Sequence, residues 1–533
     1  PAGTGVCDYR DPSPASRILP VPRFRNNSMR PLMLRLVIPA LLLLAISPIA
    51  YAASPPLVVM LEASPKTLDP VYATDAAGVR ISHQLIFDTL LSLNDRLEFA
   101  PGLAESWRRS ASTRYRLTLK KGVRFHDGTA MDARDVVHTL TTLMDPQVGS
   151  PYGSLLRDKI AAVRPLGSHR VEIELKAPYA AFLSDLLIPV RSRRAGKKNP
   201  LLGSGPFRFA GRSVNEIRLE RNDGYHGPRA GVAKVVFKVV RDESTRLLKL
   251  RKGTVHLAVN VLPLDKLVRF QRNPLKQLYR VLEAPGLSYQ YLGFNLRDPM
   301  LGNRKVRRAI AHAINVDVLI AHREKGHATR ATGLLPGGNP YADPDLRPIP
   351  FDPALAARLL DEAGYPMRAS GRFKLIYKTS TDRSAVIRAR VIQSDLRKVG
   401  IEVEVRSYEW GTFYEDIGKG NFQMFSLRWI GVNDPDFYYE LFHSSRMPPK
   451  GRNRGGYRNE QVDRLLEAGR LEGEPARRRE IYRKIHRLLQ EDLPYLSLWH
   501  NNNVAIVSRK FSGFRLHPTG GFQHLPAMRP NPP

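Results

Sequence analysis

Two hydrophobic periodicities alternate along the second half of the chain. Apolar residues three and four positions apart predict helices over residues 303–314, 352–364 and 391–400, with Asn or Asp at the start of the first two and glycine closing the last two. Apolar residues at every second position predict a strand directly afterwards, from Ile401 to Val405. This order of helix, glycine and strand predicts an α/β region whose strands are largely parallel.

The first half shows the same two periodicities in a different order. Alternation at Tyr115, Leu117 and Leu119 predicts a strand, and the run 235–240 predicts a buried one. Residues 81–91 carry one apolar helical face. Asp132 and Asp135 resemble a capping pair that opens a further helix. We therefore expect an α/β protein throughout.

One stretch combines a strand end with polar and aromatic side chains. An apolar strand over 422–427 leads into Trp429 and then into a turn-rich loop that contains Asn433, Asp434 and Asp436. Asx-Pro turns expose carboxylates, and an aromatic side chain beside them offers a ligand a flat apolar wall. In open α/β sheets ligands bind beyond the carboxyl ends of strands. The loop is therefore a candidate ligand site, and a surface turn beside a core strand is the alternative.

The beginning of the chain has the pattern of a targeting segment. From Met29, two arginines precede the apolar run 36–49, which is followed by Ala50-Tyr51-Ala52. A basic head, a short apolar stretch and small residues two apart are typical of a secretory signal peptide, here residues 29–52. The run is too short to span a bilayer comfortably, although an uncleaved anchor is the alternative. Residues 1–28 are interpreted as a non-native or mis-assigned leader.

Composition adds an unusual charge. The 533 residues include 83 Lys and Arg against 50 Asp and Glu, a net charge of +33, which is compatible with an anionic ligand, anionic lipid or simply a basic surface. The single cysteine, Cys7, lies in the leader, so the exported chain is expected to have no disulfide, no thiol nucleophile and no lipid anchor.

Catalytic and cofactor motifs do not emerge from the sequence. His126 beside Asp127 invites a general-base interpretation, but no nucleophile motif accompanies it and a structural turn is favoured. The glycine-rich stretch 203–207 is not G-x-G-x-x-G and is interpreted as a tight turn between strands. The 14 histidines are dispersed and H-E-x-x-H spacing is absent. We predict no catalytic residue, no metal, no cofactor and no nucleic-acid partner.

Eight short stretches, in order along the chain, resemble the extracellular solute-binding proteins of family 5, the peptide- and nickel-binding type of ABC importers. They are Thr67-Leu-Asp-Pro70, Pro101-Gly-Leu-Ala-Glu-Ser-Trp107, Gly122-Val-Arg-Phe-His-Asp-Gly128, Gly205-Pro-Phe207, Phe294-Asn295, Val306-Arg-Arg-Ala-Ile310, Leu359-Leu-Asp-Glu-Ala-Gly-Tyr365 and the Trp429 loop. The resemblance implies a two-lobe, type II-like periplasmic-binding-protein fold with an extra domain inserted in the first lobe. We place the first lobe at 53–283 with the insertion at about 96–199, the second lobe at 284–500, and the return to the first lobe with the tail at 501–533. Strands are expected to cross between the lobes near 284–296 and 493–500.

The resemblance also implies a function. The chain would be a periplasmic, monomeric solute-binding protein that is not an enzyme or a lipoprotein. It would capture a peptide or peptide-like solute between hinged lobes and deliver it to the membrane permease of an ABC importer. The alternatives are a basic exported protein that binds an anionic polymer or a membrane surface, and a non-transport sensor with the same fold.

Twelve ligand-binding residues follow from the motif match, from position after a strand and from charge. They are Trp429, Ile430, Gly431, Asn433, Asp434, Asp436, Tyr289, Asn295 and Tyr72, with Lys378, Arg383 and Arg428 as partners for an acidic solute.

One departure from the family pattern bears on the solute. Peptide-binding members have W-x-x-D, whose aspartate holds the amino terminus of the ligand, whereas Val432 stands at that position here. Because burying an unpaired ammonium is costly, a peptide with a free amino terminus is disfavoured unless Asp434 or Asp436 takes over that role.

Overall fold

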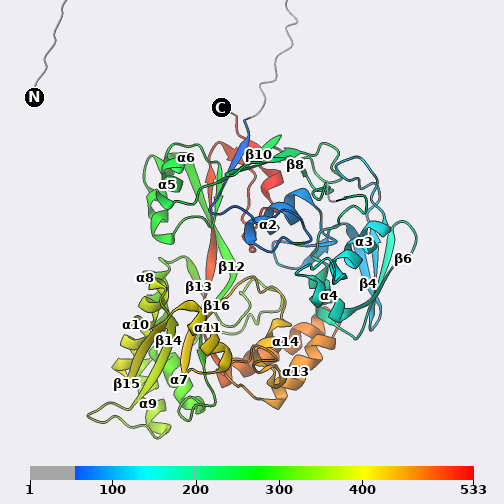
Figure 1. Cartoon of the computed structure of the whole chain (residues 1–533). Helices are drawn as coiled ribbons and strands as arrows, with labels where there is room; N and C mark the ends of the chain where they lie inside the picture. Colours follow the sequence, from blue (N-terminus) through cyan, green and yellow to red (C-terminus); the bar gives the residue numbers. More distant parts are fainter. Residues whose placement is uncertain (1–54, 197–198, 533) are drawn as a thin grey trace, which may run out of the picture. The chain divides into compact units, whose positions relative to one another are not determined.

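The computed structural model of this protein describes residues 55–196 and 199–532 (Figure 1). The predicted leader and signal peptide lie outside the described residues. Residues 54–533 group into one compact unit. No helix in the described part of the chain is long and apolar enough to cross a membrane.

An 11-stranded sheet runs through this unit in the order β15-β14-β16-β12-β17-β11-β1-β10-β9-β8, with β13 paired to β17. Its strands are β1 (Leu57–Leu61), β8 (Phe207–Arg212), β9 (Glu216–Arg221), β10 (Lys234–Val239), β11 (Leu257–Val259), β12 (Tyr279–Phe294), β13 (Ala328–Arg330), β14 (Phe373–Ser380), β15 (Ile401–Tyr408), β16 (Met424–Trp429) and β17 (Tyr495–Ser508).

The long antiparallel strands β12 and β17 connect two regions of this sheet (Figure 1). Their ends at Tyr279 and Ile506 pack in a core with β1, whereas their ends at Leu292 and Leu496 pack in a core with β14. The register shifts between Pro285 and Ser288, in the middle of the pair. The unit therefore has two lobes that share two continuous strands.

Parallel pairing is restricted to part of each lobe. Strand β14 is parallel to β15 and β16, and β1 is parallel to β10 and β11. The expectation of a largely parallel second lobe was wrong for its remaining strands. Strands β12 and β17 enter it from the first lobe and pair antiparallel to each other, and β12 also pairs antiparallel to β16.

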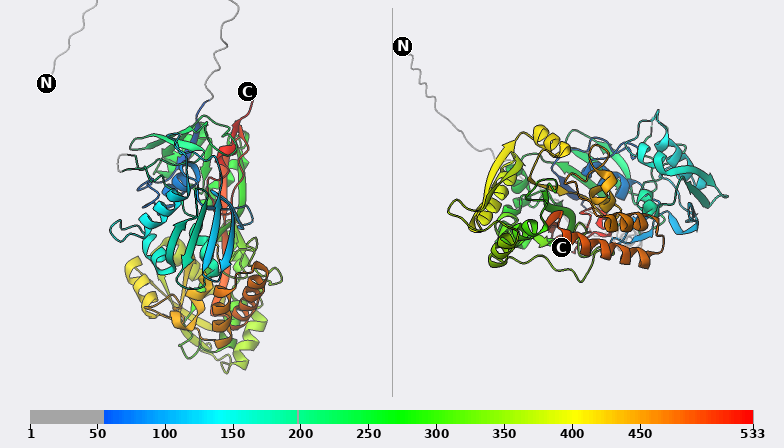
Figure 2. Two further views of the ribbon diagram at one scale, coloured as in Figure 1. Left: turned by 90° about the vertical axis from the view of Figure 1, so that its right-hand side faces the viewer. Right: turned by 90° about the horizontal axis from the view of Figure 1, so that it is seen from below.

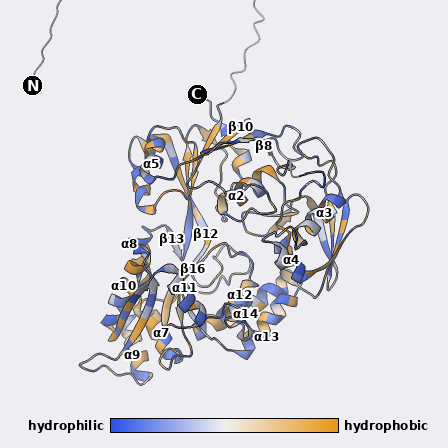
Figure 3. Ribbon diagram, in the orientation of Figure 1, coloured by the Kyte–Doolittle hydropathy of each residue, from blue (hydrophilic) through white to orange (hydrophobic). Residues whose placement is uncertain are grey.

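Helices cover the second lobe and the connections of the first. They are α2 (Ala76–Ile81) with the π-helix η1 (Ser82–Ile86), α5 (Glu243–Arg251), η3 (Leu264–Gln271), α6 (Leu275–Leu278), α7 (Arg304–Ala313), α8 (Val316–Arg323), α9 (Pro353–Glu362), α10 (Arg383–Lys398), α11 (Trp410–Lys419), α12 (Phe437–Phe442), η4 (Ser444–Arg446), α13 (Glu460–Leu471), α14 (Pro475–Asp492) and η5 (Leu525–Ala527). Figure 3 shows hydrophobic and hydrophilic positions side by side on α13 and α14, as expected for helices that bury one face.

A separate four-stranded sheet, β4-β5-β7-β6, lies within the stretch predicted as an insertion. Its elements are β4 (Ala104–Ala111), β5 (Arg114–Leu119), α3 (Ala133–Met144), α4 (Gly153–Lys159), β6 (Ile160–Pro165), β7 (Arg170–Leu175) and η2 (Ala180–Leu186). We call this region, residues 104–186, the four-stranded domain. It has its own apolar core, and in the view from below in Figure 2 it lies at the opposite end from the yellow helices and strands near residue 400. Short pairs β2 (Leu91–Leu93) with β3 (Phe99–Pro101) and β18 (Phe511–Ser512) with β19 (Arg529–Pro530) complete the structure.

Local sequence signals explain several element ends. Asp132 and Asp135 form the predicted capping box of α3. Asp352 caps α9, with Pro353 in its first turn. The helix predicted over 81–91 instead ends at Ile86.

The stretch 203–207 is not a tight turn between strands as expected. It follows η2 and packs against the chain at residues 85–88, where a Cβ at Gly203 would lie 2.1 Å from the Ile86 carbonyl oxygen. Glycine is required here by that close approach.

Candidate functional site

A cavity of about 1070 Å³ lies among the ends of several segments of the two lobes. We call it the large cavity. One wall comes from residues 76–93 and 225–229, and the other from residues 428–433 and 501–503. Segments more than 300 residues apart thus face one space, which is large enough for a small organic solute.

The loop after β16 reaches the large cavity through Ile430 and Gly431. The Ile430 side chain is 73% exposed, and Gly431 has φ 75°, a left-handed conformation that favours glycine. The Gly431 amide donates to the Leu287 carbonyl at 3.1 Å, which fixes the turn. Val432 then points into an apolar cluster and is only 7% exposed. Val432, at the last position of the W-x-x-D pattern, is therefore a core residue.

Trp429 is part of the second lobe's aromatic packing. Its ring stacks on Tyr291 with centroids 6.3 Å apart and meets Phe437 edge-on at 5.1 Å. The guanidinium groups of Arg452 and Arg454 lie 5.3 and 5.4 Å from the ring centroid. The tryptophan is not among the residues lining the large cavity. Its ring contacts hold the start of the loop against the second lobe.

Both aspartates of the loop make ion pairs within the protein. Asp434 binds the guanidinium of Arg478 at 2.9 Å, and Asp436 binds that of Arg470 at 2.9 Å. Neither aspartate lines the large cavity. Their carboxylates are therefore engaged, and the substitute role considered for them at a ligand amino terminus has no geometric support.

The same aspartates contact the four-stranded domain. The Tyr179 hydroxyl donates to Asp436 at 2.8 Å, and the Ser184 hydroxyl donates to Asp434 at 3.1 Å. Close by, Asp185 pairs with Lys159 at 2.7 Å, but burial and the two other carboxylates raise the pKa of Asp185 to about 6 despite that lysine. Burial likewise raises the pKa of Asp436. These groups join the four-stranded domain to the second lobe.

Of four further predicted residues, two line the large cavity and two do not. Arg428 and Asn433 line the large cavity with Ile430 and Gly431. Lys378 pairs with Asp416 at 2.7 Å, and Arg383 is the first residue of α10; neither lines the large cavity.

Tyr72, Asn295 and Tyr289 have structural contacts. The Tyr72 hydroxyl donates to the Val148 carbonyl at 3.1 Å, and the Asn295 amide donates to the Phe422 carbonyl at 2.8 Å. Tyr289 is buried and shares a 2.8 Å hydrogen bond with Ser497. None of the three predicted residues lines the large cavity.

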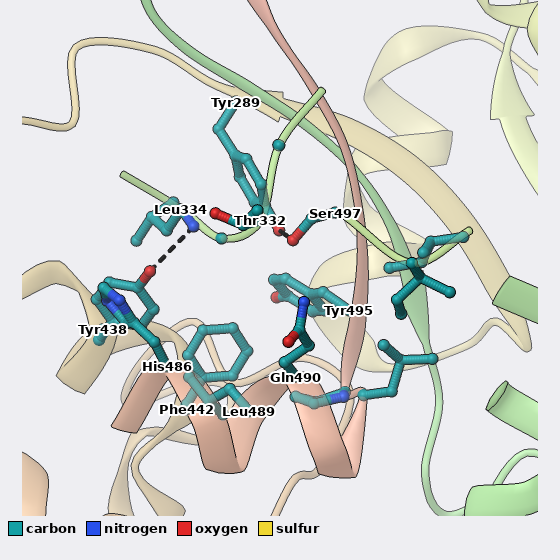
Figure 4. Close-up of a pocket in the computed structure, with 16 residues that line it drawn as sticks. Tyr289, Thr332, Leu334, Tyr438, Phe442, His486, Leu489, Gln490, Tyr495 and Ser497 are labelled. Atoms are coloured by element: carbon teal, nitrogen blue, oxygen red, sulfur yellow. Dashed lines mark hydrogen bonds between the residues drawn. The ribbon is translucent and has the colours of Figure 1, made fainter. Parts of the chain in front are cut away.

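Tyr289 instead borders a second, much smaller cavity of about 40 Å³ inside the second lobe (Figure 4). Figure 4 shows its wall, with the Leu334 amide donating to the Tyr438 hydroxyl at 3.0 Å. This volume suits one or two water molecules and excludes a peptide-sized solute. The large cavity is the candidate site.

Sequence reasoning missed a polar cluster on the first-lobe wall. Asp88 accepts hydrogen bonds from the Ser204 hydroxyl at 2.9 Å, the Tyr225 hydroxyl at 3.0 Å and the His226 ring at 3.1 Å. The partners lie more than 100 residues away, so no local pattern marks them. Across residues 55–196 and 199–532, no group of three His, Cys, Asp or Glu side chains could hold a metal ion.

Comparisons with known proteins agree with this architecture. The model of the family described as "Bacterial extracellular solute-binding proteins, family 5 Middle" matches residues 98–448. The dipeptide-binding protein of Escherichia coli (strain K12) is 27% identical over 515 residues, which cover 90% of this chain and 95% of that protein.

Two solved structures are similar over nearly their whole length. HbpA2 from Haemophilus parasuis has a TM-score of 0.81 at 24% identity, with 90% of this chain and 100% of that chain covered. At this identity the similarity supports the fold and not the function. The periplasmic binding protein DppA from Helicobacter pylori, solved in complex with the peptide STSA, has a TM-score of 0.67 at 28% identity, with 89% and 98% covered.

Proposed function

Because the chain belongs to the bacterial extracellular solute-binding proteins of family 5, we propose that it captures a peptide or peptide-like solute in the large cavity and delivers it to the permease of an ABC importer. The observation that carries the proposal is the cavity itself, about 1070 Å³ between walls supplied by residues 76–93 and 428–433. The similarity to a dipeptide-binding protein and to a structure with a bound peptide supports the solute class.

The mechanism follows from the connections between the lobes. Strands β12 and β17 shift register near Pro285 and Ser288, close to the cavity residue Leu287. A solute that contacts both walls stabilises the arrangement in which both walls reach it, because binding shifts the population toward the conformation with more contacts. The protein performs this capture as a monomer, without catalysis and without a nucleic-acid partner.

Export is part of the proposal. We infer that the signal peptide predicted at residues 29–52 is cleaved after Ala52 or Ala53, which releases the chain into the periplasm. The only cysteine, Cys7, precedes that point, so the released chain has no thiol for a lipid anchor. We also propose the domain limits predicted from the sequence: a first lobe over 53–283 with an inserted domain at about 96–199, a second lobe over 284–500, and a return to the first lobe over 501–533.

Thermal unfolding against a panel of solutes tests the function. The panel contains di- to pentapeptides, N-blocked peptides, murein-derived peptides, acidic metabolites and divalent metals. A solute at 100 times its Kd stabilises the folded state by about 2.7 kcal/mol, which gives a clear rise in Tm. No shift with any peptide or blocked peptide, together with retention on anionic vesicles or DNA, would contradict the proposal and favour a basic surface-binding protein.

A further inference from the structure

Cations dominate the charged residues that line the large cavity. Two acidic residues line it, Asp88 and Glu324. Against these stand five basic residues, which are Arg80, Lys120, Arg229, Arg428 and Arg529. The charge of the wall therefore favours an anionic solute.

Both acidic residues already accept hydrogen bonds from the protein. Both carboxylate oxygens of Asp88 already accept hydrogen bonds, from Ser204, Tyr225 and His226. Glu324 accepts a hydrogen bond from the Asn501 amide at 2.7 Å. An ammonium group beside Asp88 would thus compete with three hydrogen bonds that the protein has already made, which makes its burial there costly.

Arg80 is the basic residue best placed to bind an anion. It lies on α2 at the first-lobe wall, half-buried, with its guanidinium carbon 5.9 Å from the centroid of Phe522. Among the described residues, no carboxylate oxygen lies within 4.0 Å of its guanidinium nitrogens. Burial lowers the pKa of Arg80, while the charge of Glu62 raises it. A guanidinium that is partly withdrawn from water and unpaired gains most from a carboxylate, which it can bind with two hydrogen bonds.

Two polar atoms on the same wall of the cavity as Arg80 also lack a partner among the described residues. His83, three residues further on, lines the cavity and its Nε2 is buried without a hydrogen-bond partner among the described residues. The same holds for the side-chain oxygen of Gln523, which follows Phe522. Burial lowers the pKa of His83 to about 4, so its ring is neutral at neutral pH. This wall of the cavity therefore contains two polar atoms whose hydrogen-bonding capacity the described residues do not use.

We propose that the solute binds in the large cavity as an anion without a free ammonium group, and that the Arg80 guanidinium holds its carboxylate. This inference rests on the proposed function and specifies its solute class. The chemistry expected is that of an N-blocked or otherwise acylated acidic peptide, in which the only formal charges are negative.

Equilibrium dialysis of the exported protein, which is the whole chain after the proposed cleavage site, against three matched tripeptide libraries tests the inference. The libraries share their side chains and differ at the ends: N-acetylated with a free carboxylate, free at both ends, and free at the amino end with a C-terminal amide. We expect the N-acetylated library to be enriched most and the amide library least, as read by mass spectrometry of the bound fraction.

Variants then assign the effect to Arg80. Arg80→Gln is expected to weaken binding of the best N-acetylated tripeptide at least about tenfold, because a charged hydrogen-bonded contact is lost. Arg80→Lys keeps the charge and is expected to retain part of the affinity. Arg251→Gln is the matched control, because Arg251 is exposed on α5 and does not line the cavity. Tm values of the ligand-free variants show that the fold is retained.

The outcomes separate the inference from the function on which it rests. Preferential binding of the library free at both ends, or unchanged affinity of Arg80→Gln for the N-acetylated tripeptide, overturns the inference and leaves the peptide-binding function in place. If none of the three libraries binds, the proposed peptide-binding function is itself overturned, and the inference with it.

Discussion

The carboxylate of Asp434 lies 2.9 Å from the guanidinium of Arg478, and both side chains are largely withdrawn from water. Asp434 sits in the loop after β16, whereas Arg478 is in the first turns of α14. The Arg478 side chain is only 4% exposed and also donates to the Gly469 carbonyl at 3.0 Å. The pair therefore fixes the loop to the helical part of the second lobe, and Ser184 extends that contact to the four-stranded domain.

Removing the Asp434 carboxylate should destabilise the protein. Asp434→Ala leaves the Arg478 guanidinium buried without its counter-charge, which costs about 3 kcal/mol for a pair of this kind. The free energy of unfolding from urea titration measures the loss.

The double variant Asp434→Ala with Arg478→Met is the control for this pair. Removing both charges should recover part of the loss, because no unpaired ion then remains buried. If the losses in the free energy of unfolding for Asp434→Ala and for Arg478→Met add up to that of the double variant, the pairing is contradicted.

Trp429→Ala should lower the free energy of unfolding, whereas any effect on solute affinity should be indirect. The position in the motif suggests a ligand-contacting tryptophan whose loss weakens binding, but the ring packs on Tyr291 and Phe437 and does not line the large cavity. We expect a loss of about 2 kcal/mol in the free energy of unfolding. Unfolding and solute titration of the same variant separate the two effects, and a large loss of affinity at unchanged stability would place the ring at the solute.

A methyl group at Gly203 should disturb the first-lobe wall. The added Cβ would lie 2.1 Å from the Ile86 carbonyl oxygen, so Gly203→Ala forces the backbone apart and should cost at least about 2 kcal/mol. Gly337→Ala is the matched control, because nothing lies within 4 Å of a Cβ there. Equal Tm values for the two variants would show that Gly203 does not lie this close to the Ile86 carbonyl.

Acidification should weaken the second lobe through His486. This residue is buried on α14, with its ring 4.8 Å from that of Tyr438, and burial lowers its pKa from 6.5 to about 4, although the charge of Asp343 opposes that shift. Between these two values the unfolded chain binds a proton that the folded chain does not, so the free energy of unfolding falls as pH falls from 6.5 to 4.

His486→Leu removes this one contribution. The loss of stability between pH 7 and pH 4.5 should be smaller by about 2 kcal/mol in the variant than in the parent protein. Urea titrations at the two pH values measure it, and parallel losses in both proteins would mean that His486 already titrates normally in the folded state.

Local signals in the sequence predicted element ends better than the site. Asp352 with Pro353 and Asp132 with Asp135 act within one helical turn, so their capping roles could be predicted from spacing alone. The strand before Trp429 was predicted within two residues of β16. By contrast, short-range periodicity carries no information on pairing across the fold, such as the antiparallel course of β12 and β17.

The candidate site depended on the same long-range contacts. Of the predicted residues in the Trp429 loop, Ile430, Gly431 and Asn433 line the large cavity, whereas Asp434 and Asp436 turn to arginines 44 and 34 positions away. A carboxylate next to a proline looks exposed in sequence, but only the tertiary packing decides whether it meets solvent, a solute or a buried guanidinium.

The most direct test of the account is whether a charge placed in the large cavity changes solute affinity. Ile430 lines that cavity and is 73% exposed, so Ile430→Glu adds a carboxylate without disturbing a core, and Val214→Glu, at an 81% exposed position that does not line it, is the matched control. Isothermal titration with the tightest solute of the panel should show at least about a tenfold weaker Kd for Ile430→Glu, unchanged affinity for Val214→Glu and unchanged Tm for both. Equal affinity of the two variants and the parent protein would contradict capture of the solute in this cavity.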